Sequence, residues 1–392
     1  PMETTPIQLV SYTFLCVLVV TVLLKLRSAS GSRPNLPPGP WALPVVGHMH
    51  FLLGALPHQA MRSLSRRHGP VMLLRLGHVP TLVLSSAEAA RQLMKVHDAA
   101  FANRPVYTPA DVFTNGGQNI SFARHDSRHW KAVRKLCTVE LLSPRRVRSF
   151  RPVREEEAAR LVRSVADAGA LVDVGERVKV MMNDVIMRDV FSAGSETTAT
   201  TTIWAMPELI RNPRIMAIAQ SEVRRVLQGK TKVAEADIDG RLHYLQMVIK
   251  ETFRLHPPVP LLIPRLCTEQ RKIMGFDVPP GTTVFANVWA IGRDEKSWTD
   301  AEEFKPERFE SEMVDYGGTD FRFLPGGVGR RMCPGMMFGV SNIEIALASL
   351  LYHFNWRFPG DGNGNKLDMT EAYGMTTRRK TKLLLEAIAF EP

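Results

Sequence analysis

The chain has 392 residues, with 50 Lys and Arg against 39 Asp and Glu, a formal net charge of +11, and 45% hydrophobic residues. This composition excludes an intrinsically disordered chain, because enough apolar side chains are present to build a core. The four cysteines lie far apart, which excludes a disulfide-stapled secreted domain. The basic residues are spread along the chain without a nucleic-acid-binding signature, so we expect no nucleic acid partner and a better match to anionic lipid or an acidic protein.

The first apolar segment, residues 7–26, is close to the roughly 20 residues that span the core of a bilayer. A cleaved signal peptide is the alternative, but such a peptide begins with basic residues, and Glu3 precedes this segment with no Lys or Arg. Lys25, Arg27 and Arg33 carry the positive charge at its other end, which places the main body in the cytosol by the positive-inside rule. We therefore expect one transmembrane anchor.

The anchor divides the chain into a membrane part and one globular body. Residues 1–6 are a short tail, and residues 27–40 are a basic, proline-rich hinge whose prolines favour extended backbone. Residues 41–392 contain no internal repeat and no low-complexity block. We expect them to form a single domain.

The body has the pattern of a mostly helical domain with small sheets. Two β-rich runs, 71–76 and 81–85, flank a turn and predict a hairpin. Ser85 and Glu88 have the spacing of a capping box, which predicts a helix that runs toward His97. The further predicted elements are, in chain order, basic amphipathic helices at 130–142 and 153–165, a β-rich zone at 272–288, helical periodicity over 334–348 that continues over 340–354, and a final strand at 382–389.

The segment FLPGGVGRRMCPG, residues 323–335, carries the strongest chemical signal. Glycines allow the backbone to approach a large flat ligand closely. A helix predicted to begin at Pro334, together with Arg330 and Arg331, favours a thiolate at Cys333. A thiolate can act as a nucleophile, which needs a histidine base that is not nearby in sequence, or as a metal ligand. A buried structural cysteine is the remaining alternative.

Taken in order, the motifs of this chain resemble those of the haem-thiolate monooxygenases, the cytochrome P450 superfamily, in its plant microsomal type. The resemblance extends over nearly the whole chain. Most of the motifs are weak singly, but their order and the cysteine loop at the end are specific. They are PPGP at 37–40, Trp130 and Arg134 in WKAVR, AGSETT at 193–198, Glu251 and Arg254 in KETFR, Arg308 in FKPERF, and GRRMCPG around Cys333.

The resemblance implies that Cys333 is the axial ligand of the iron of haem b, where a thiolate favours cleavage of the O–O bond. It also implies a buried network of Glu251, Arg254 and Arg308 that supports the cysteine loop. Glu251 and Arg254 have helical i,i+3 spacing, so an exposed surface pair is the alternative. The other residues implied to bind the cofactor are Trp130, Arg134 and Arg331 at the haem propionates and Gly327, Gly329 and Gly335 in the loop; solvated arginines and a core tryptophan are the alternatives.

The AGSETT motif is polar within an otherwise helical, apolar segment. The resemblance implies a helix kink over the haem, with Thr197 and Glu196 as proton donors for the reaction of dioxygen. Ala193 and Gly194 would leave room for oxygen and substrate. The structural alternative is that the threonines bond back to the carbonyl four residues earlier and bend the helix.

The chain departs from the family pattern in two places. The family usually carries an aromatic residue where this chain has Gly326. The glycine lacks that ring and so removes packing near the cysteine. Trp130 and Gly194 are only 64 positions apart, whereas family members have several more helices between these motifs. We therefore expect a fold that is incomplete in the lid region, with the missing internal segment near 173–184.

The resemblance implies a monooxygenase that inserts one oxygen atom of O2 into an apolar, terpenoid-like small molecule. The electrons would come from NADPH through a reductase. The predicted location is the endoplasmic reticulum membrane, crossed once, with the catalytic body facing the cytosol and touching membrane lipid. The substrate residues, chosen from where family pockets lie, are Val112, Phe113, Ala193, Val259, Leu261, Leu262, Tyr373 and Met375; their alternative role is ordinary core packing.

Two other classes of protein remain open. The first is a catalytically impaired truncated isoform that is at most a membrane-bound haem binder. The second is a soluble hydrolase that uses Ser195, although the sequence around Ser195 lacks the second glycine of a nucleophile elbow.

Overall fold

A computed structural model describes residues 34–106, 114, 116–169, 171–189, 194–311, 314–360, 367–372, 374 and 376–391. Within these residues, no helix is both long and apolar enough to cross a membrane. Several predictions fall outside the described residues, and these are the anchor at 7–26 and the substrate residues Val112, Phe113, Ala193, Tyr373 and Met375.

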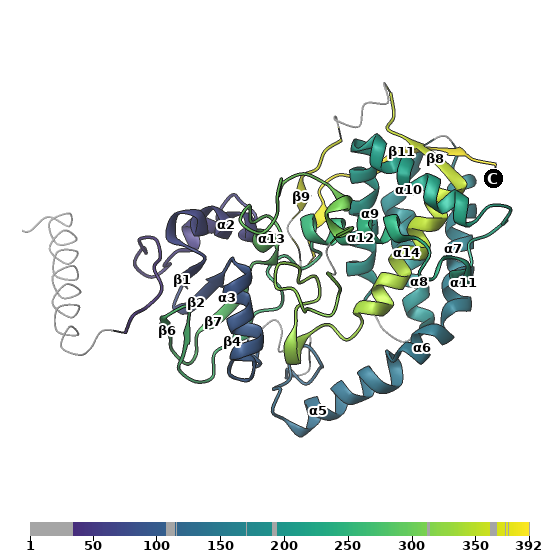
Figure 1. Cartoon of the computed structure of the whole chain (residues 1–392). Helices are drawn as coiled ribbons and strands as arrows, with labels where there is room; N and C mark the ends of the chain where they lie inside the picture. Colours follow the sequence, from purple (N-terminus) through teal and green to yellow (C-terminus); the bar gives the residue numbers. More distant parts are fainter. Residues whose placement is uncertain are drawn as a thin grey trace, which may run out of the picture.

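A small sheet forms one side of the molecule (Figure 1). Strands β1 (Val71–Leu76) and β2 (Val79–Leu84) form the predicted antiparallel hairpin. Strand β2 pairs in parallel with β7 (Thr283–Ala286), and β4 (Arg265–Leu266) completes the order β1-β2-β7-β4. The elements around this sheet are η1 (Met49–Leu52), α2 (Pro57–His68), α3 (Ala87–Arg91), η2 (Gln92–Val96), η3 (Asp98–Phe101), the hairpin of β5 (Arg271–Ile273) and β6 (Phe276–Val278), and α13 (Val288–Ile291).

Helix α3 begins one residue later than the capping box predicted. Its N-cap is Ser86, whose side chain accepts a hydrogen bond from the backbone N–H of Ala89. Glu88 does not close a box, because its carboxylate is paired with Arg91. The side-chain oxygen of Ser86 still satisfies one of the free N–H groups at the helix start.

The helical body forms the other side of the molecule (Figure 1). Its central helix, α14 (Met336–His353), has buried residues all around, as expected of a helix that is apolar on every face. The core around it is shared by helices on several sides. These helices are α7 (Arg151–Ala166), α8 (Val174–Asp189), α9 (Ser195–Arg211), α10 (Pro213–Val226) and α12 (His243–Leu255), with the shorter α5 (Arg128–Lys135), η4 (Leu136–Leu141), α6 (Pro144–Ser149), α11 (Glu235–Ile238), η5 (Pro306–Phe309) and η6 (Gly329–Arg331) nearby.

Two more small sheets close the body. Strand β11 (Leu384–Ala389) lies between β3 (Leu171–Asp173) and β8 (Phe354–Arg357), and β9 (Glu371–Ala372) pairs with β10 (Arg378–Arg379). The expectation of a mainly α fold with small sheets is therefore confirmed.

The segments near the predicted internal gap differ from the sequence expectation. Residues 171–189 form β3 and α8 in direct succession, so no break marks the join that we predicted near 173–184. The described part of the AGSETT motif, residues 194–198, lies at the start of α9, which begins at Ser195 with Gly194 as its N-cap. The polar motif thus opens a helix instead of interrupting one.

Candidate functional site

Cys333 lies in a tight glycine turn two residues before the N-cap of α14. Its backbone N–H donates to the carbonyl of Gly326 at 2.9 Å. Gly327 and Gly329 have φ values of +66° and +77°, a region that favours glycine. A Cβ added at Gly326 would lie 3.0 Å from Sδ of Met336 and 3.2 Å from Cβ of Cys333. The missing aromatic at 326 is therefore matched by Met336, which occupies that space.

The thiol of Cys333 has a more mixed environment than the sequence indicated. Its side chain is accessible to solvent, yet the surrounding protein desolvates it, and this burial raises its pKa. The backbone of Gly335 and the charge of Arg134 act in the opposite direction and are weaker. The expectation that the loop alone would lower this pKa is wrong. A bound metal ion deprotonates a coordinating thiol regardless of this cost.

Arg331 and Trp130 meet at one point of the backbone. The indole N–H of Trp130 and the Nη1 group of Arg331 both donate to the carbonyl of Ile120, at 2.9 and 3.1 Å. Arg331 also donates to the carbonyls of Ala102 and Ala123, and its guanidinium lies 4.7 Å from the centre of the Trp130 ring. These two residues are therefore close together, and both are partly engaged by the protein backbone.

Two further arginines, which the sequence interpretation missed, belong to this cluster. Arg104 is buried and donates to the carbonyls of Ser121, Ile263 and Pro264. Arg265 is buried and donates to the carboxylate of Asp98 at 2.8 Å and to the carbonyl of Val328 at 2.9 Å. The available signal for Arg265 was a charged residue inside the apolar run LLIPRL.

Positive charge is in excess around the cysteine loop. Burial and the neighbouring Arg265 and Arg331 hold the pKa of Arg104 well below its usual value. Burial, Arg265 and Arg134 lower the pKa of Arg331 to about 10, and burial lowers that of Arg134. Such mutual repulsion favours an anionic ligand. A haem, with two carboxylates and an iron that takes a thiolate, fits this set of residues.

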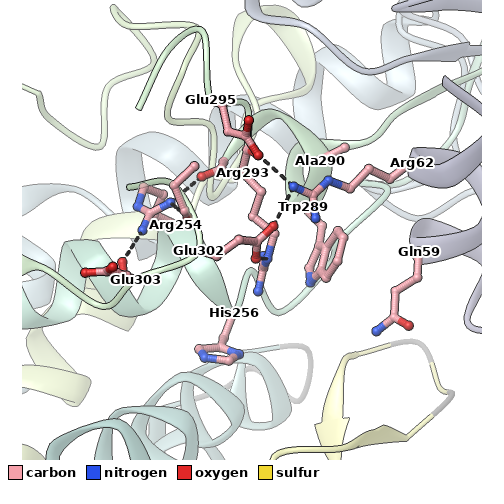
Figure 2. Close-up of polar contacts among 12 residues, drawn as sticks. Gln59, Arg62, Arg254, His256, Trp289, Ala290, Arg293, Glu295, Glu302 and Glu303 are labelled. Atoms are coloured by element: carbon pink, nitrogen blue, oxygen red, sulfur yellow. Dashed lines mark hydrogen bonds and ion pairs between the residues drawn. The ribbon is translucent and has the colours of Figure 1, made fainter. Parts of the chain in front are cut away.

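Glu251 lies at the centre of the predicted network. Its carboxylate is fully buried and accepts two bonds from Arg254, at 2.6 and 2.7 Å, and one from Arg308 at 3.0 Å. It also accepts the backbone N–H of Lys305 at 2.8 Å. The exposed-pair alternative is thus wrong. Arg254 extends the network to the backbone of Glu303, as Figure 2 shows, at 2.9 Å.

The polar side chains at the start of α9 point to different partners. The Thr197 hydroxyl donates to the carbonyl of Gly194 at 3.2 Å, and that of Thr198 donates to the same carbonyl. Glu196 accepts from the Thr376 hydroxyl at 2.8 Å and lies 3.5 Å from Nε of Arg378. The back-bonding that we gave as the structural alternative is therefore present. The structure does not place Glu196 and Thr197 on a shared partner.

A cavity of about 530 Å³ lies beside this part of α9. It is lined by α8, by the Glu196 face of α9 and by the basic segment 378–383. The predicted substrate residues Val259, Leu261 and Leu262 are not among its lining residues. Leu261 packs in the core below the sheet, whereas Leu262 lies against the cysteine loop, 3.4 Å from where a Cβ of Gly327 would stand.

Comparison with known proteins gives consistent matches. The chain is 38% identical to Zealexin A1 synthase of Zea mays, over 95% of this chain and 96% of that protein. It is 39% identical to ent-isokaurene C2/C3-hydroxylase of Oryza sativa subsp. japonica, over 93% and 95%. In structure it is similar to a zebrafish cytochrome P450 solved with progesterone, with a TM-score of 0.77, 21% identity, and coverage of 86% of this chain and 100% of that one.

These matches also locate an internal gap. The alignment with Zealexin A1 synthase runs over 488 positions, 96 more than the 392 residues of the chain. The chain therefore lacks a segment that this relative has, as the short distance between the Trp130 and Ala193 motifs indicated. The model of the cytochrome P450 family matches residues 37–193 and again 187–385, which is most of the chain. The chain belongs to the cytochrome P450 family of monooxygenases.

Proposed function

We propose that this chain holds haem b with Cys333 as the axial iron ligand and acts as a monooxygenase on an apolar, terpenoid-like molecule. The family binds haem through a cysteine thiolate, and bound haem supplies the activation of dioxygen. The observation that carries the proposal is the placement of Cys333 in a glycine turn beside an excess of buried arginine charge. Gly335 lies at the helix start and would let the haem approach.

The arginines would hold the haem carboxylates. Arg134 lies near Cys333, Arg331 lies two residues before it, and guanidinium groups suit carboxylates in paired geometry. Trp130 would fix the orientation of Arg331 through their contact. Glu251, Arg254 and Arg308 would support the loop from the other side through the segment 303–305.

Thr197 and Glu196 would deliver protons at the face of α9 that borders the proposed site. The Thr197 hydroxyl donates its one hydrogen to the carbonyl of Gly194, so its oxygen can still accept a hydrogen bond from a proton donor. Glu196 is held by Thr376 and faces Arg378. Gly194 keeps this part of the helix free of a side chain.

An apolar substrate suits both the chain and its relatives. Val259, Leu261 and Leu262 are half-buried and apolar, and Leu262 borders the cysteine loop. One relative is a dolabradiene monooxygenase and another an ent-isokaurene hydroxylase. These names support oxidation of a hydrocarbon-like terpenoid here.

The electrons would come from NADPH through a reductase that docks near the cysteine loop. Helices α5 and α6 expose a basic face there, with Arg128, Lys131, Lys135, Arg145 and Arg148 on the surface. An acidic partner would be attracted to this face and oriented on it.

The protein would lie on the endoplasmic reticulum membrane with its body in the cytosol. The described part closest in sequence to the predicted anchor exposes large apolar side chains, among them Trp41 at 72% and Leu53 at 77%. Val79, at the tip of the β1–β2 turn, is also exposed. Exposed apolar groups of this kind suit contact with lipid.

A second function, an impaired haem binder, is favoured by the internal gap. The two family matches meet at 187–193, which we propose as the position of the missing segment. Met187 is 75% exposed there, and the 530 Å³ cavity separates α8 from the basic segment 378–383. A site that lacks the helices of its lid region admits water, and this weakens catalysis.

One experiment distinguishes these functions. The full chain is expressed with haem supply and compared with Cys333→Ala by its reduced carbon-monoxide difference spectrum and by NADPH-dependent substrate oxidation with added reductase. A thiolate-type band lost in Cys333→Ala supports haem binding, and turnover above background supports the enzyme. A band without turnover supports the haem binder. Equal spectra for both proteins would overturn the assignment of Cys333.

A further inference from the structure

Asp98 connects the cysteine loop to the sheet side of the molecule. It begins η3, and its side chain is only 7% exposed. One carboxylate oxygen accepts Nη1 of Arg265 at 2.8 Å. The other accepts both the backbone N–H of Arg330 at 3.0 Å and its Nη1 at 2.9 Å.

The contacts of Asp98 flank a point of close approach. A Cβ added at Gly329 would lie 2.7 Å from Oδ1 of Asp98 and 2.6 Å from the carbonyl oxygen of Met94. Val328, on one side of Gly329, is held through Arg265, and Arg330, on the other side, is held directly. The three residues before Arg331 are thus fixed against η2 and η3 by one carboxylate.

Asp98 is also the counter-charge of the buried Arg265. Arg265 donates to one carboxylate oxygen of Asp98 and to the carbonyl of Val328. Burial lowers the pKa of Arg265, and its hydrogen bond with Asp98 opposes this. Loss of the carboxylate would therefore leave a buried charge without its partner.

We propose that Asp98 is a positioning residue, which clamps residues 328–330 directly and through Arg265 so that Cys333 stands where it can bind iron. This inference rests on the proposed function in that Cys333 is taken as the haem ligand. Asp98 itself acts through the loop and through Arg265.

The test compares Asp98→Asn with the parent chain. Asparagine keeps the shape but leaves Arg265 buried without a counter-charge, which is costly. We expect haem to transfer to excess apomyoglobin about 30-fold faster or more, as for loss of one partner of a buried charge pair. The thiolate-type carbon-monoxide band should shift toward the thiol type. Glu88→Gln, which removes an exposed carboxylate–Arg91 pair nearby, should leave both unchanged.

Two further variants isolate the clamp. Asp98→Asn combined with Arg265→Gln removes both charges, and we expect it to retain haem better than Asp98→Asn alone, since a neutral pair avoids the unpaired charge. Arg330→Ala removes only a half-exposed partner, so its effect should be about fivefold or less. Arg330→Ala also tests the clamp if Asp98→Asn does not fold, and no effect on spectrum or haem transfer would then count against it.

A haem-free measurement separates this inference from the proposed function. Without haem, a released loop should label faster with a maleimide at Cys333 in Asp98→Asn than in the parent chain or in Glu88→Gln. Equal labelling together with unchanged haem transfer and spectrum would overturn the clamp, as would parent-like haem transfer in the double variant, which would assign the loss to the unpaired charge alone. If Cys333→Ala retains its haem, the proposed function fails, and the labelling rates still decide whether Asp98 holds the loop.

Discussion

The cysteine-loop side and the α9 side of the proposed site are built to different degrees. On the loop side, Asp98, Arg265 and Glu251 are buried, and each makes several hydrogen bonds. On the α9 side, Met187 is exposed, a cavity separates α8 from the basic segment 378–383, and the family match is interrupted. The difference teaches that holding a cofactor and turning over a substrate depend on separate parts of the fold.

The largest effect should come from Cys333→Ala, which removes the proposed iron ligand on the cysteine-loop side of the site. We expect haem content after purification to fall to background, because Cys333 is the thiol that the glycine turn holds at the proposed haem site. The measurement is the haem-to-protein ratio. Cys267→Ala is the matched control, since this thiol is buried beside the small sheet and burial raises its pKa to about 11. Equal haem in Cys333→Ala and its control would show that another group binds the iron.

Restoring the missing internal segment should change the α9 side of the proposed site. We expect insertion of the corresponding segment of Zealexin A1 synthase between residues 187 and 193 to raise NADPH-coupled oxidation above background and to raise the melting temperature. Dye binding to apolar surface should fall, because Met187 and its neighbours become covered. The parent chain is the control. Equal turnover, melting and dye binding would show that the short form is complete.

Thr197→Ala tests the α9 face in the chain that carries the restored segment. Positioned proton transfer contributes typically about 10²–10⁴-fold, so we expect product formed per NADPH to fall while haem content stays constant. Thr201→Ala is the matched control, since its hydroxyl only donates to the Thr197 carbonyl at 3.1 Å. A parent-like yield from Thr197→Ala would indicate that this hydroxyl only bonds back to the carbonyl of Gly194.

Glu251→Gln should weaken the support of the loop. Removal of one charge from a buried pair costs about 3–5 kcal/mol, and here two arginines lose their partner. We expect a lower urea midpoint with an unchanged slope. Asp300→Asn, which removes an exposed pair with Lys305, should leave the urea midpoint close to that of the parent chain. Similar midpoints for the two variants would place Glu251 outside the support of the loop.

The comparison also shows what the sequence could predict. Glu251 and Arg254 are three residues apart on a helix, so their pairing follows from local geometry. Asp98 and Arg265 are 167 positions apart and meet only through the tertiary fold, so no local spacing announces them. The start of α9 at Ser195 was missed for a related reason, since apolar residues on both sides of AGSETT suggested one continuous helix.

The smallest effect concerns Glu344, a half-buried acid on α14 that lies near three other acidic side chains. Burial, together with Asp239, Glu235 and Glu222, raises its pKa to about 7, while a hydrogen bond from Gln246 only partly opposes this. The folded state therefore keeps a proton that the unfolded chain, with a pKa near 4.5, releases. The resulting stability is fully present below pH 4.5 and is lost as pH rises through about 7.

Glu344→Gln removes this titration. We expect the variant to match the parent chain near pH 4.5 and to be more stable by about 1–3 kcal/mol above pH 7, because glutamine cannot acquire the buried charge. The measurement is urea unfolding from pH 5 to pH 8, with Glu310→Gln on the surface as control. A pH-independent difference would mean that Glu344 acts through packing alone. A difference confined to high pH would show that ionisation of Glu344 on α14 lowers the stability of the folded chain at alkaline pH.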